Sequence, residues 1–363
     1  MIALDDVKEL LKKADENTLS LYVDVNPALP DNQAATPTWR IWLRNALHEV
    51  ESGLRKDQMA AWHRIRPRVE EFFNSYRPQS TSLAIFFGTD LQLEYPLQVP
   101  LQNRGSFGPP LITPLLWALD EQEPYLIALV DREEAHLLMT YLGRLMGQEV
   151  DRLKLDTSQW HQTTVRPATS RGGRTFQGSS HRDDFERRVD EHERRFWRQV
   201  GTHLEATMSR HHVRKLILSG PEEATTAVRA DLPERVARSV VGILSLPPRI
   251  SDTEVLEQAH RVADSAERRA ESGLVETVMD QAKSAGRGAL GKEPVLDALQ
   301  GGLVETIVAA WPAQDEDLLE QVAHQALHNG VRMELVRDKA AEELRRHDGL
   351  GALLRYVPPA FPQ

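Results

Sequence analysis

The chain has 363 residues, 40% of them hydrophobic and 27% charged, with a formal net charge of −10 and no cysteine. This composition is typical of a folded soluble protein of two or three domains, and it excludes disulfides, thiolate zinc sites and a cysteine nucleophile. The absence of an apolar run as long as a bilayer is thick argues against a membrane span. The N-terminus is charged from Asp5 onward and lacks a signal-peptide core, so we expect a cytoplasmic protein.

The first part of the chain predicts a mixed α+β unit. Residues Leu19 to Val25 alternate and are rich in β-formers, which predicts a strand. Apolar residues from Trp39 to Leu54 recur at helical spacing, which predicts a helix. The other predicted elements are a helix over residues 5–15, a helix over 58–76 that is interrupted near Pro67, and paired strands over 81–89 and 91–101.

The middle of the chain predicts a layered α/β unit, because strands alternate with helices. Residues from Tyr125 to 145 predict a hairpin, and the turn Asp131–Glu134 reads as its solvated tip rather than an acid/base pair. The other predicted elements are strands over 213–220 and 240–245 and a helix over 224–232. Ser251, followed by an acid three residues later, fits the capping box of a long connecting helix that runs to about Ser284.

The last part of the chain predicts a second α/β unit, which starts at Glu293. Gly330 follows a helix and supplies the left-handed residue that ends it. We expect the strands 303–309 and 331–336 to pair in one sheet, with Gly349 and Gly351 at a tight turn. Further helices are predicted over 294–302, 318–329 and 340–346. The fold class is therefore α/β with an α+β N-terminal unit, in three domains: 1–122, 123–265 and 266–363.

A basic stretch in the middle unit is the main candidate for function. Between residues 166 and 182 the chain has four arginines, no carboxylate and Gly172-Gly173 at its centre. Glycine lets a backbone approach a partner closely. Asp183 and Asp184 then predict a helix start, and Phe185, Val189, Phe196 and Val200 recur at helical spacing. The stretch is either a probe that reaches an anionic partner or a surface loop that lacks acids. The candidate RNA-binding residues are Arg166, Arg171, Arg174 and Arg182.

Several common site types are absent from the sequence. It contains no GxxxxGK[ST], no HExxH and no GxSxG motif. The 13 histidines are mostly scattered; His192 and His203 could share a helix face, but no carboxylates are placed to complete a coordination shell. We therefore expect no metal and no cofactor.

Three segments of the middle unit together resemble the archaeo-eukaryotic peptide chain release factor and Pelota family. They are YLIALVDREEAHLLMTYLGRL, the loop and helix around Gly172-Gly173, and VRKLILSGPEEATTAVRADLPERV. In the last unit, VLDALQGGLVETIVA and AAEELRRHDGLGALLRY are similar to the family's C-terminal segments, and LSLYVDVNP and SLAIFFGT match the N-terminal part more loosely. The chain looks most like the family's bacterial branch.

The resemblance implies a three-domain factor that enters the ribosomal A site, with an RNase H-like middle domain and an L7Ae-like αβα C-terminal domain. In the family, a Gly-Gly-Gln loop reaches the peptidyl-transferase centre and positions water against the peptidyl ester. Here the triplet is Gly172-Gly173-Arg174, and Gln177 lies three residues later. The family's Asn-Ile-Lys-Ser motif for stop codons has no match between Ser20 and Thr89.

The resemblance therefore predicts a ribosome hibernation or stalled-ribosome factor that does not read stop codons. Its expected partners are rRNA near the peptidyl-transferase centre and a translational GTPase, with no membrane and no DNA. One alternative is a peptidyl-tRNA hydrolase that uses Gln177 or the backbone N–H of Arg174; the side chain of Arg174 would otherwise grip RNA or stay solvated. Another alternative is a non-ribosomal RNA-binding or interaction module.

Overall fold

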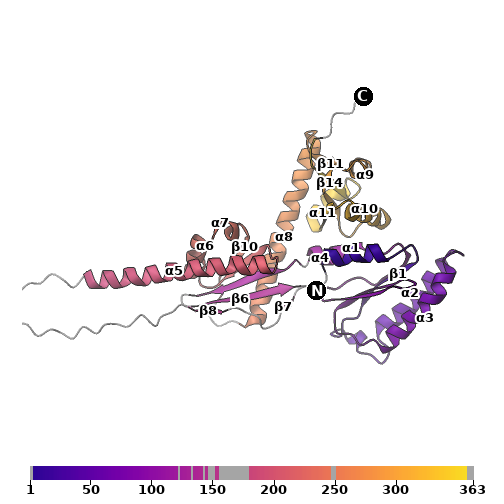
Figure 1. The fold of residues 1–363 in the computed structure, drawn as a ribbon, viewed down its shortest axis with the longest axis horizontal. Coiled ribbons are helices and arrows are strands. Elements are labelled where there is room, and N and C mark those ends of the chain that lie inside the picture. Colours follow the sequence, from indigo (N-terminus) through magenta and orange to yellow (C-terminus); the bar gives the residue numbers. More distant parts are fainter. Residues whose placement is uncertain are drawn as a thin grey trace, which may run out of the picture. The chain divides into compact units, whose positions relative to one another are not determined.

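The structure, a computed structural model, describes residues 3–121, 123–131, 134–141, 144–145, 152–154, 180–246 and 251–357. It divides into two compact units, one formed by residues 1–123 together with 267–363 and the other by 124–266 (Figure 1). The expected α/β class is confirmed, since the described chain forms three sheets covered by helices. The three-domain division at residues 122 and 265 stays a prediction.

The N-terminal part of the first unit is a four-stranded antiparallel sheet with strand order β3-β2-β1-β4. Its strands are β1 (Thr18–Asp24), β2 (Ser82–Phe87), β3 (Gln92–Leu97) and β4 (Arg104–Gly108). Its helices are α1 (Leu4–Lys13), η1 (Pro30–Asn32), α2 (Thr38–Gly53), α3 (Met59–Ser75) and α4 (Thr113–Glu121). Alternate residues of β1, such as Leu19 and Leu21, pack with Leu43, Trp62 and Ile65 in one core because side chains alternate across a strand.

Two features of this part differ from the sequence-based expectation. Helix α3 runs without interruption through Pro67, because Ile65 before it and Val69 after it are both buried on the core face while Pro67 itself is exposed. Helix α4, which the sequence did not predict, begins at Thr113 and has six buried residues of nine. Burial on nearly every side removes the amphipathic period by which a surface helix is recognised.

The C-terminal part of the first unit has the strand order β11-β14-β12-β13. Its elements are β11 (Gly288–Leu290), α9 (Lys292–Gln300), β12 (Val304–Ala310), α10 (Glu316–His328), β13 (Arg332–Val336), α11 (Asp338–Arg345) and β14 (Leu350–Leu354). The predicted pairing is confirmed, since β12 and β13 are parallel neighbours. Gly330 ends α10 with a φ of 64° and Gly349 forms a turn with a φ of 69°. The expectation for Gly351 is wrong, because it lies inside β14 and packs against Val278.

The second unit is built on one mixed sheet with strand order β10-β9-β5-β6-β7, and β8 also pairs with β6. Its strands are β5 (Tyr125–Val130), β6 (Glu134–Tyr141), β7 (Arg144–Leu145), β8 (Arg152–Lys154), β9 (Lys215–Ser219) and β10 (Val240–Leu244). Strands β5, β9 and β10 are parallel, and β5 and β6 form the predicted hairpin. Where the two strands meet, the Glu134 N–H donates to Asp131 Oδ1 at 2.8 Å. Residues 132–133, at the centre of the predicted turn, lie outside the described residues.

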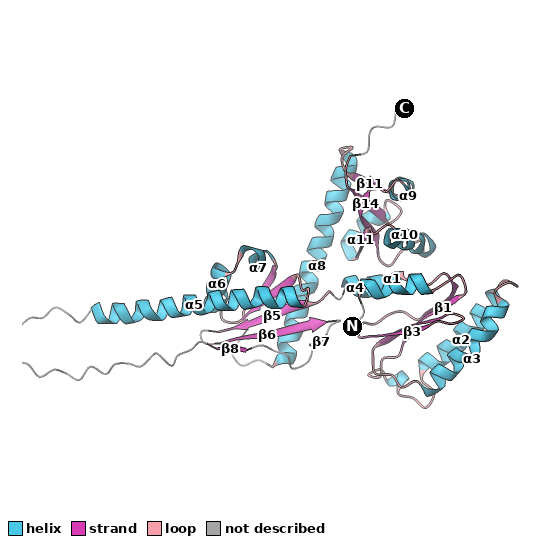
Figure 2. Ribbon diagram, in the orientation of Figure 1, coloured by secondary structure: helices cyan, strands magenta, loops and turns pink. Residues whose placement is uncertain are grey.

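Helices cover both faces of this sheet (Figure 2). They are α5 (Ser180–Arg210), α6 (Glu222–Asp231), α7 (Glu234–Arg238) and the first part of α8 (Asp252–Lys283). Val255 and Ala259 of α8 pack with Ile127 and Ile217 of the sheet, and the core that contains α5, α6 and α7 lies on the other face. The predicted capping box of α8 is confirmed, since Ser251 Oγ accepts from the Glu254 N–H at 3.3 Å and Glu254 Oε2 accepts from the Ser251 N–H at 3.2 Å.

Candidate functional site

The candidate loop residues Gly172, Gly173, Arg174 and Gln177, together with Arg166 and Arg171, lie outside the described residues. The backbone of Arg182 lies in the first turn of α5, and its side chain is also outside the described part of the chain. The structure does define the segments that flank the loop, since β8 ends at Lys154 and α5 begins at Ser180. The helix therefore starts one turn before the predicted start at Asp183.

The C-terminal half of α5 is anchored in the core of the second unit. Its buried residues recur at helical spacing and include Phe196, Trp197, Val200, Leu204 and Met208. They pack with residues of β5, β9, α6 and α7 in one cluster. Gly201 brings the helix close to α7, because a Cβ at that position would lie 3.0 Å from Pro233 Cδ.

The N-terminal half of α5 extends past the sheet (Figure 1). Phe196 is the first buried residue of the helix among those whose side chains are described, 191–210. From Ser180 to Phe196 an α-helix rises by about 24 Å, at roughly 1.5 Å per residue. The helix thus holds the end of the loop well away from the core that anchors it.

The other end of the loop is attached to the hairpin. Strand β8 pairs antiparallel with β6, so that Arg152 lies opposite His136 and Lys154 opposite Glu134. Lys154 Nζ also lies 3.8 Å from Glu134 Oε2, on the exposed surface. Both flanks of the candidate loop are therefore fixed to the same sheet-and-helix scaffold, which is the arrangement that a rigid element presenting a binding loop needs.

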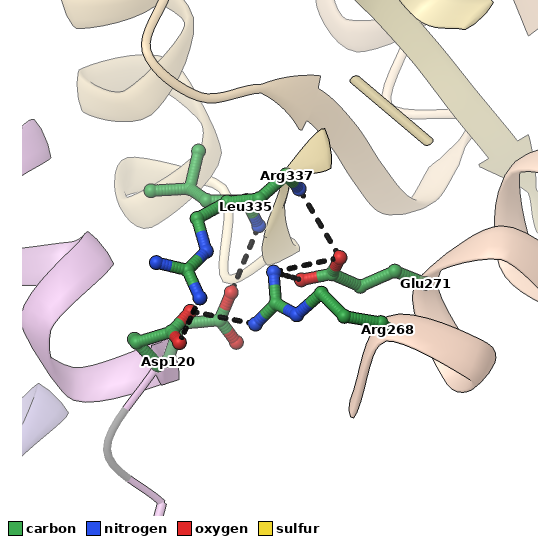
Figure 3. Close-up of polar contacts among 6 residues, drawn as sticks. Asp120, Arg268, Glu271, Leu335 and Arg337 are labelled. Atoms are coloured by element: carbon green, nitrogen blue, oxygen red, sulfur yellow. Dashed lines mark hydrogen bonds and ion pairs between the residues drawn. The ribbon is translucent and has the colours of Figure 1, made fainter. Parts of the chain in front are cut away.

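A buried ionic network, which the sequence did not predict, lies where α4 meets the C-terminal sheet within the first unit (Figure 3). Glu121 of α4 accepts from Arg268 at 2.8 Å and from Arg337 at 2.6 Å. The carboxylate of Glu271 accepts from Arg268 at 3.0 Å and from the Arg337 N–H at 3.1 Å. Asp120 accepts from the Leu335 N–H at 2.9 Å. The network joins α4, α8 and the end of β13.

Burial shifts the pKa of two carboxyls in this network upward. It raises the pKa of Asp120 well above its usual value, with the neighbouring Glu334 carboxylate adding to the effect. It also raises the pKa of Glu271 to about 7, against the opposing effects of the Arg337 N–H and of Arg268. Perturbed carboxyls can mark an acid/base site. Here Asp120 accepts from a backbone N–H, and Glu271 accepts from a backbone N–H and an arginine, across a packed interface. We therefore interpret the two carboxyls as groups that hold the packed elements together and not as groups that bind a substrate.

Metal-ligating side chains do not cluster within the described residues, where no group of three or more histidines or carboxylates could hold an ion. The helices of that same part of the chain include none that is long and apolar enough to cross a membrane.

Comparison with known proteins locates the family signal in a segment that covers nearly all of the second unit. Residues 110–264 match the family described as bacterial archaeo-eukaryotic release factor family 10. Over this segment the chain is similar to the bacterial branch of the release factor/Pelota family. The resemblance expected from the three middle segments is thereby confirmed.

Two archaeal proteins match this chain over similar lengths. The protein pelota homolog of Pyrococcus furiosus is 26% identical over 196 residues, which cover 51% of this chain and 54% of the relative. The protein pelota homolog of Thermococcus onnurineus is 30% identical over 178 residues, which cover 45% of this chain and 49% of the relative. The chain thus spans about half the length of the curated relatives it matches.

Among solved structures, the fold is similar to archaeal Pelota in a ribosome-bound model with ABCE1. That likeness has 14% sequence identity and a TM-score of 0.45, and it covers 98% of this chain and 94% of the other.

Proposed function

We propose that this release factor/Pelota relative is a cytoplasmic ribosome-associated factor that occupies the A site of idle or stalled ribosomes. The observation that carries the proposal is the position of the candidate loop. It lies inside the segment 110–264 that matches the family, between β8 and a helix whose N-terminal half extends about 24 Å beyond its anchored half. A basic loop on such an arm is suited to reach into a deep anionic cavity, and rRNA near the peptidyl-transferase centre supplies one.

The proposed factor acts without reading a stop codon and without hydrolysing peptidyl-tRNA. The sequence lacks the family's Asn-Ile-Lys-Ser motif, and Arg174 stands where the family has glutamine. Arginine is a bidentate phosphate binder that is always charged, so Arg174 is better suited to hold RNA than to orient a water molecule. Hibernation is therefore the function we favour over rescue by hydrolysis, with a translational GTPase as the proposed partner.

Co-sedimentation with purified 70S ribosomes tests the binding part of the proposal. Each rRNA phosphate neutralised by the loop contributes roughly 0.7 to 0.9 to the slope of log K against log salt. Replacing the four loop arginines with alanine should therefore weaken binding and flatten that slope, whereas valine at Gly172 and Gly173 should weaken binding with little change in slope. The variant carries alanine at Arg166, Arg171, Arg174 and Arg182.

A matched control removes the same charge elsewhere on the surface, with alanine at the exposed residues Arg44, Arg55, Arg64 and Arg238. If the control weakens ribosome binding and flattens the slope as much as the loop variant does, the loop is not the contact. If the wild-type protein does not sediment with ribosomes, the alternative of a non-ribosomal module replaces the proposal.

Release of labelled peptide from a stalled ribosome complex separates hibernation from hydrolysis. Arg174→Gln restores the family triplet and should create or raise peptide release, because the glutamine side chain can then order water beside the ester. Wild-type protein should release no peptide above background. Release by the wild-type protein at the rate of the glutamine variant would instead establish the rescue enzyme, with Gln177 or the Arg174 backbone N–H as the candidate group.

A further inference from the structure

A cleft lies within the first unit, between helix α1 of the N-terminal part and helices α9 and α10 of the C-terminal part. Its volume is about 630 Å³, within the range of small-molecule sites, roughly 300 to 1,000 Å³. Four basic residues line it, Lys8 and Lys12 from α1 and His324 and His328 from α10. No carboxylate is among the lining residues in the described part of the chain. In a chain with a formal net charge of −10, such a cleft offers an anion a local site of opposite sign.

The wall formed by His324 is held in place by contacts between the two parts of the unit. His324 Nε2 lies 2.9 Å from the Pro110 carbonyl oxygen, which can only accept, so Nε2 carries the hydrogen. Glu320 lies one turn earlier on α10, 3.4 Å from the same nitrogen, and also accepts from the N–H groups of Ile112 and Thr113. The hydrogen on Nε2 is thus used in contacts between the two parts of the unit. Nδ1 has no hydrogen-bond partner among the described residues.

The charge of His324 also favours an anion. Burial opposes protonation of its imidazole, but the hydrogen bonds to Glu320 and to the Pro110 carbonyl outweigh burial, and the pKa of His324 is raised. When protonated, the ring presents a second N–H at Nδ1. Lys12 and His328 have no ion-pair partner within the described residues, and Lys8 is paired only with the exposed Asp5 at 3.1 Å. Basic residues in the last turns of α1 and α10 are expected for helix stability alone, but that effect does not require a shared cleft.

The rest of the lining suits more than an isolated anion. Gln325 and Asn329 supply amide groups that can donate and accept, and Leu11 and Leu327 supply apolar surface. Amides and apolar walls beside a cluster of cations are the groups that recognise a nucleoside phosphate, with phosphate on the cations and the base against the leucines. We propose that this cleft binds the phosphate of a nucleotide unit, either as a free nucleotide or as part of an RNA strand.

Binding there would bridge the two parts of the first unit, because Lys8 and Lys12 belong to one part and His324 and His328 to the other. A ligand that needs both sets of cations stabilises the arrangement in which they face each other. The inference does not depend on the proposed function, since the site is separate from the loop and is tested without ribosomes.

The test is calorimetric titration of the full-length chain with inorganic pyrophosphate, with ATP and with a short single-stranded RNA. The double variant Lys8→Ala with Lys12→Ala should weaken binding of the ligand by about 10-fold or more, because two charge-assisted contacts are lost. The matched control is Lys13→Ala with Lys339→Ala, which removes the same charge from exposed residues that do not line the cleft. His328→Gln is a third variant on the opposite wall and should also weaken binding. Thermal melting of each variant verifies that it is folded.

Binding of ATP without RNA would assign a free nucleotide, and binding of RNA without ATP would assign a strand; either supports the proposal. The proposal would be overturned if none of the three probes gave heat or a shift in melting temperature at millimolar concentration. Equal weakening by the cleft variant and the control would overturn it too, because the effect would then come from overall charge and not from the cleft.

Discussion

The buried network around Glu121 predicts a large penalty for removing a single charge. Glu121→Gln keeps the size of the side chain but takes away the counter-charge of two arginines. The side chains involved are mostly shielded from water, with 10% of Glu121, 17% of Arg268 and 30% of Arg337 exposed. An ionised hydrogen bond contributes roughly 1.5 to 3 kcal/mol, and a stranded buried charge costs more than the bond itself.

Glu121→Gln affects Arg268 and Arg337 to different extents. Arg268 keeps its contact with Glu271 at 2.9 Å, so it retains one carboxyl partner. Arg337 loses a 2.6 Å contact with Glu121, but it is exposed enough for water to replace part of that contact. The free energy of unfolding should therefore fall by about 2 to 3 kcal/mol, below the simple sum of two bonds. With a urea dependence of about 2 to 3 kcal/mol per molar, the midpoint should shift by about 1 M.

Urea denaturation and hydrogen exchange together measure this effect. Exchange should accelerate in α4, residues 113–121, where Glu121 lies, and at the Leu335 N–H, which Asp120 of the same helix holds. The control is Glu9→Gln, which breaks an exposed pair with Lys13 on α1 and should leave the urea midpoint unchanged. If Glu121→Gln behaves like this control, or if α4 exchanges at the wild-type rate, the network does not hold α4 to the C-terminal sheet.

Two further predictions concern the buried carboxyl of Glu271 and the backbone at Gly220. The pKa of Glu271 is raised to about 7 from 4.5, so the folded state binds its proton more tightly than the unfolded chain does, and stability should fall as pH rises from about 5 to about 8. Glu271→Gln should remove most of that fall, about 3 kcal/mol at most, and melting temperatures at the two pH values would show it. Gly220 has a φ of 149°, and a Cβ there would lie 2.0 Å from the Val130 carbonyl oxygen. Gly220→Ala should therefore destabilise the second unit by about 2 kcal/mol or more in urea denaturation, while Gly53→Ala, with nothing within 4 Å of the added Cβ, should not; equal midpoints for the two variants would contradict the clash.

The sequence predicted best those features whose cause lies within a few residues. The capping box at Ser251 needs only an acid three residues later, and the end of α10 needs only Gly330 in the left-handed region. The hairpin at Asp131 likewise depends on alternation and a short turn. These signals are local, so a single sequence contains them. Helix α4 was not predicted, because the residues that bury it are distant in the chain.

The interfaces could not have been predicted in the same way. Glu121 meets Arg337 across 216 positions, and His324 meets Pro110 across 214 positions. No periodicity or spacing relates such residues, because it is the folded arrangement that brings them together. For the loop, the sequence is more informative than the structure. Residue types and the family resemblance identified Gly172-Gly173-Arg174 as candidate site residues, while the structure describes only the segments that flank the loop.

The division of α5 into an anchored and an extended half affects how loop variants are read. Ser180 lies about 24 Å along the helix from Phe196, the first buried residue among the described side chains. At physiological salt, exposed charges are screened beyond about 8 Å, so a charge change next to Ser180 should act only weakly on the core between Phe196 and Met208. A substitution such as Arg174→Gln should then leave the urea midpoint where it is while it changes behaviour on the ribosome. The part of α5 that packs in the core and the end of α5 that carries the loop are thus far apart along the helix. A loop variant that loses ribosome binding but keeps the wild-type urea midpoint can therefore be assigned to a lost loop contact and not to unfolding.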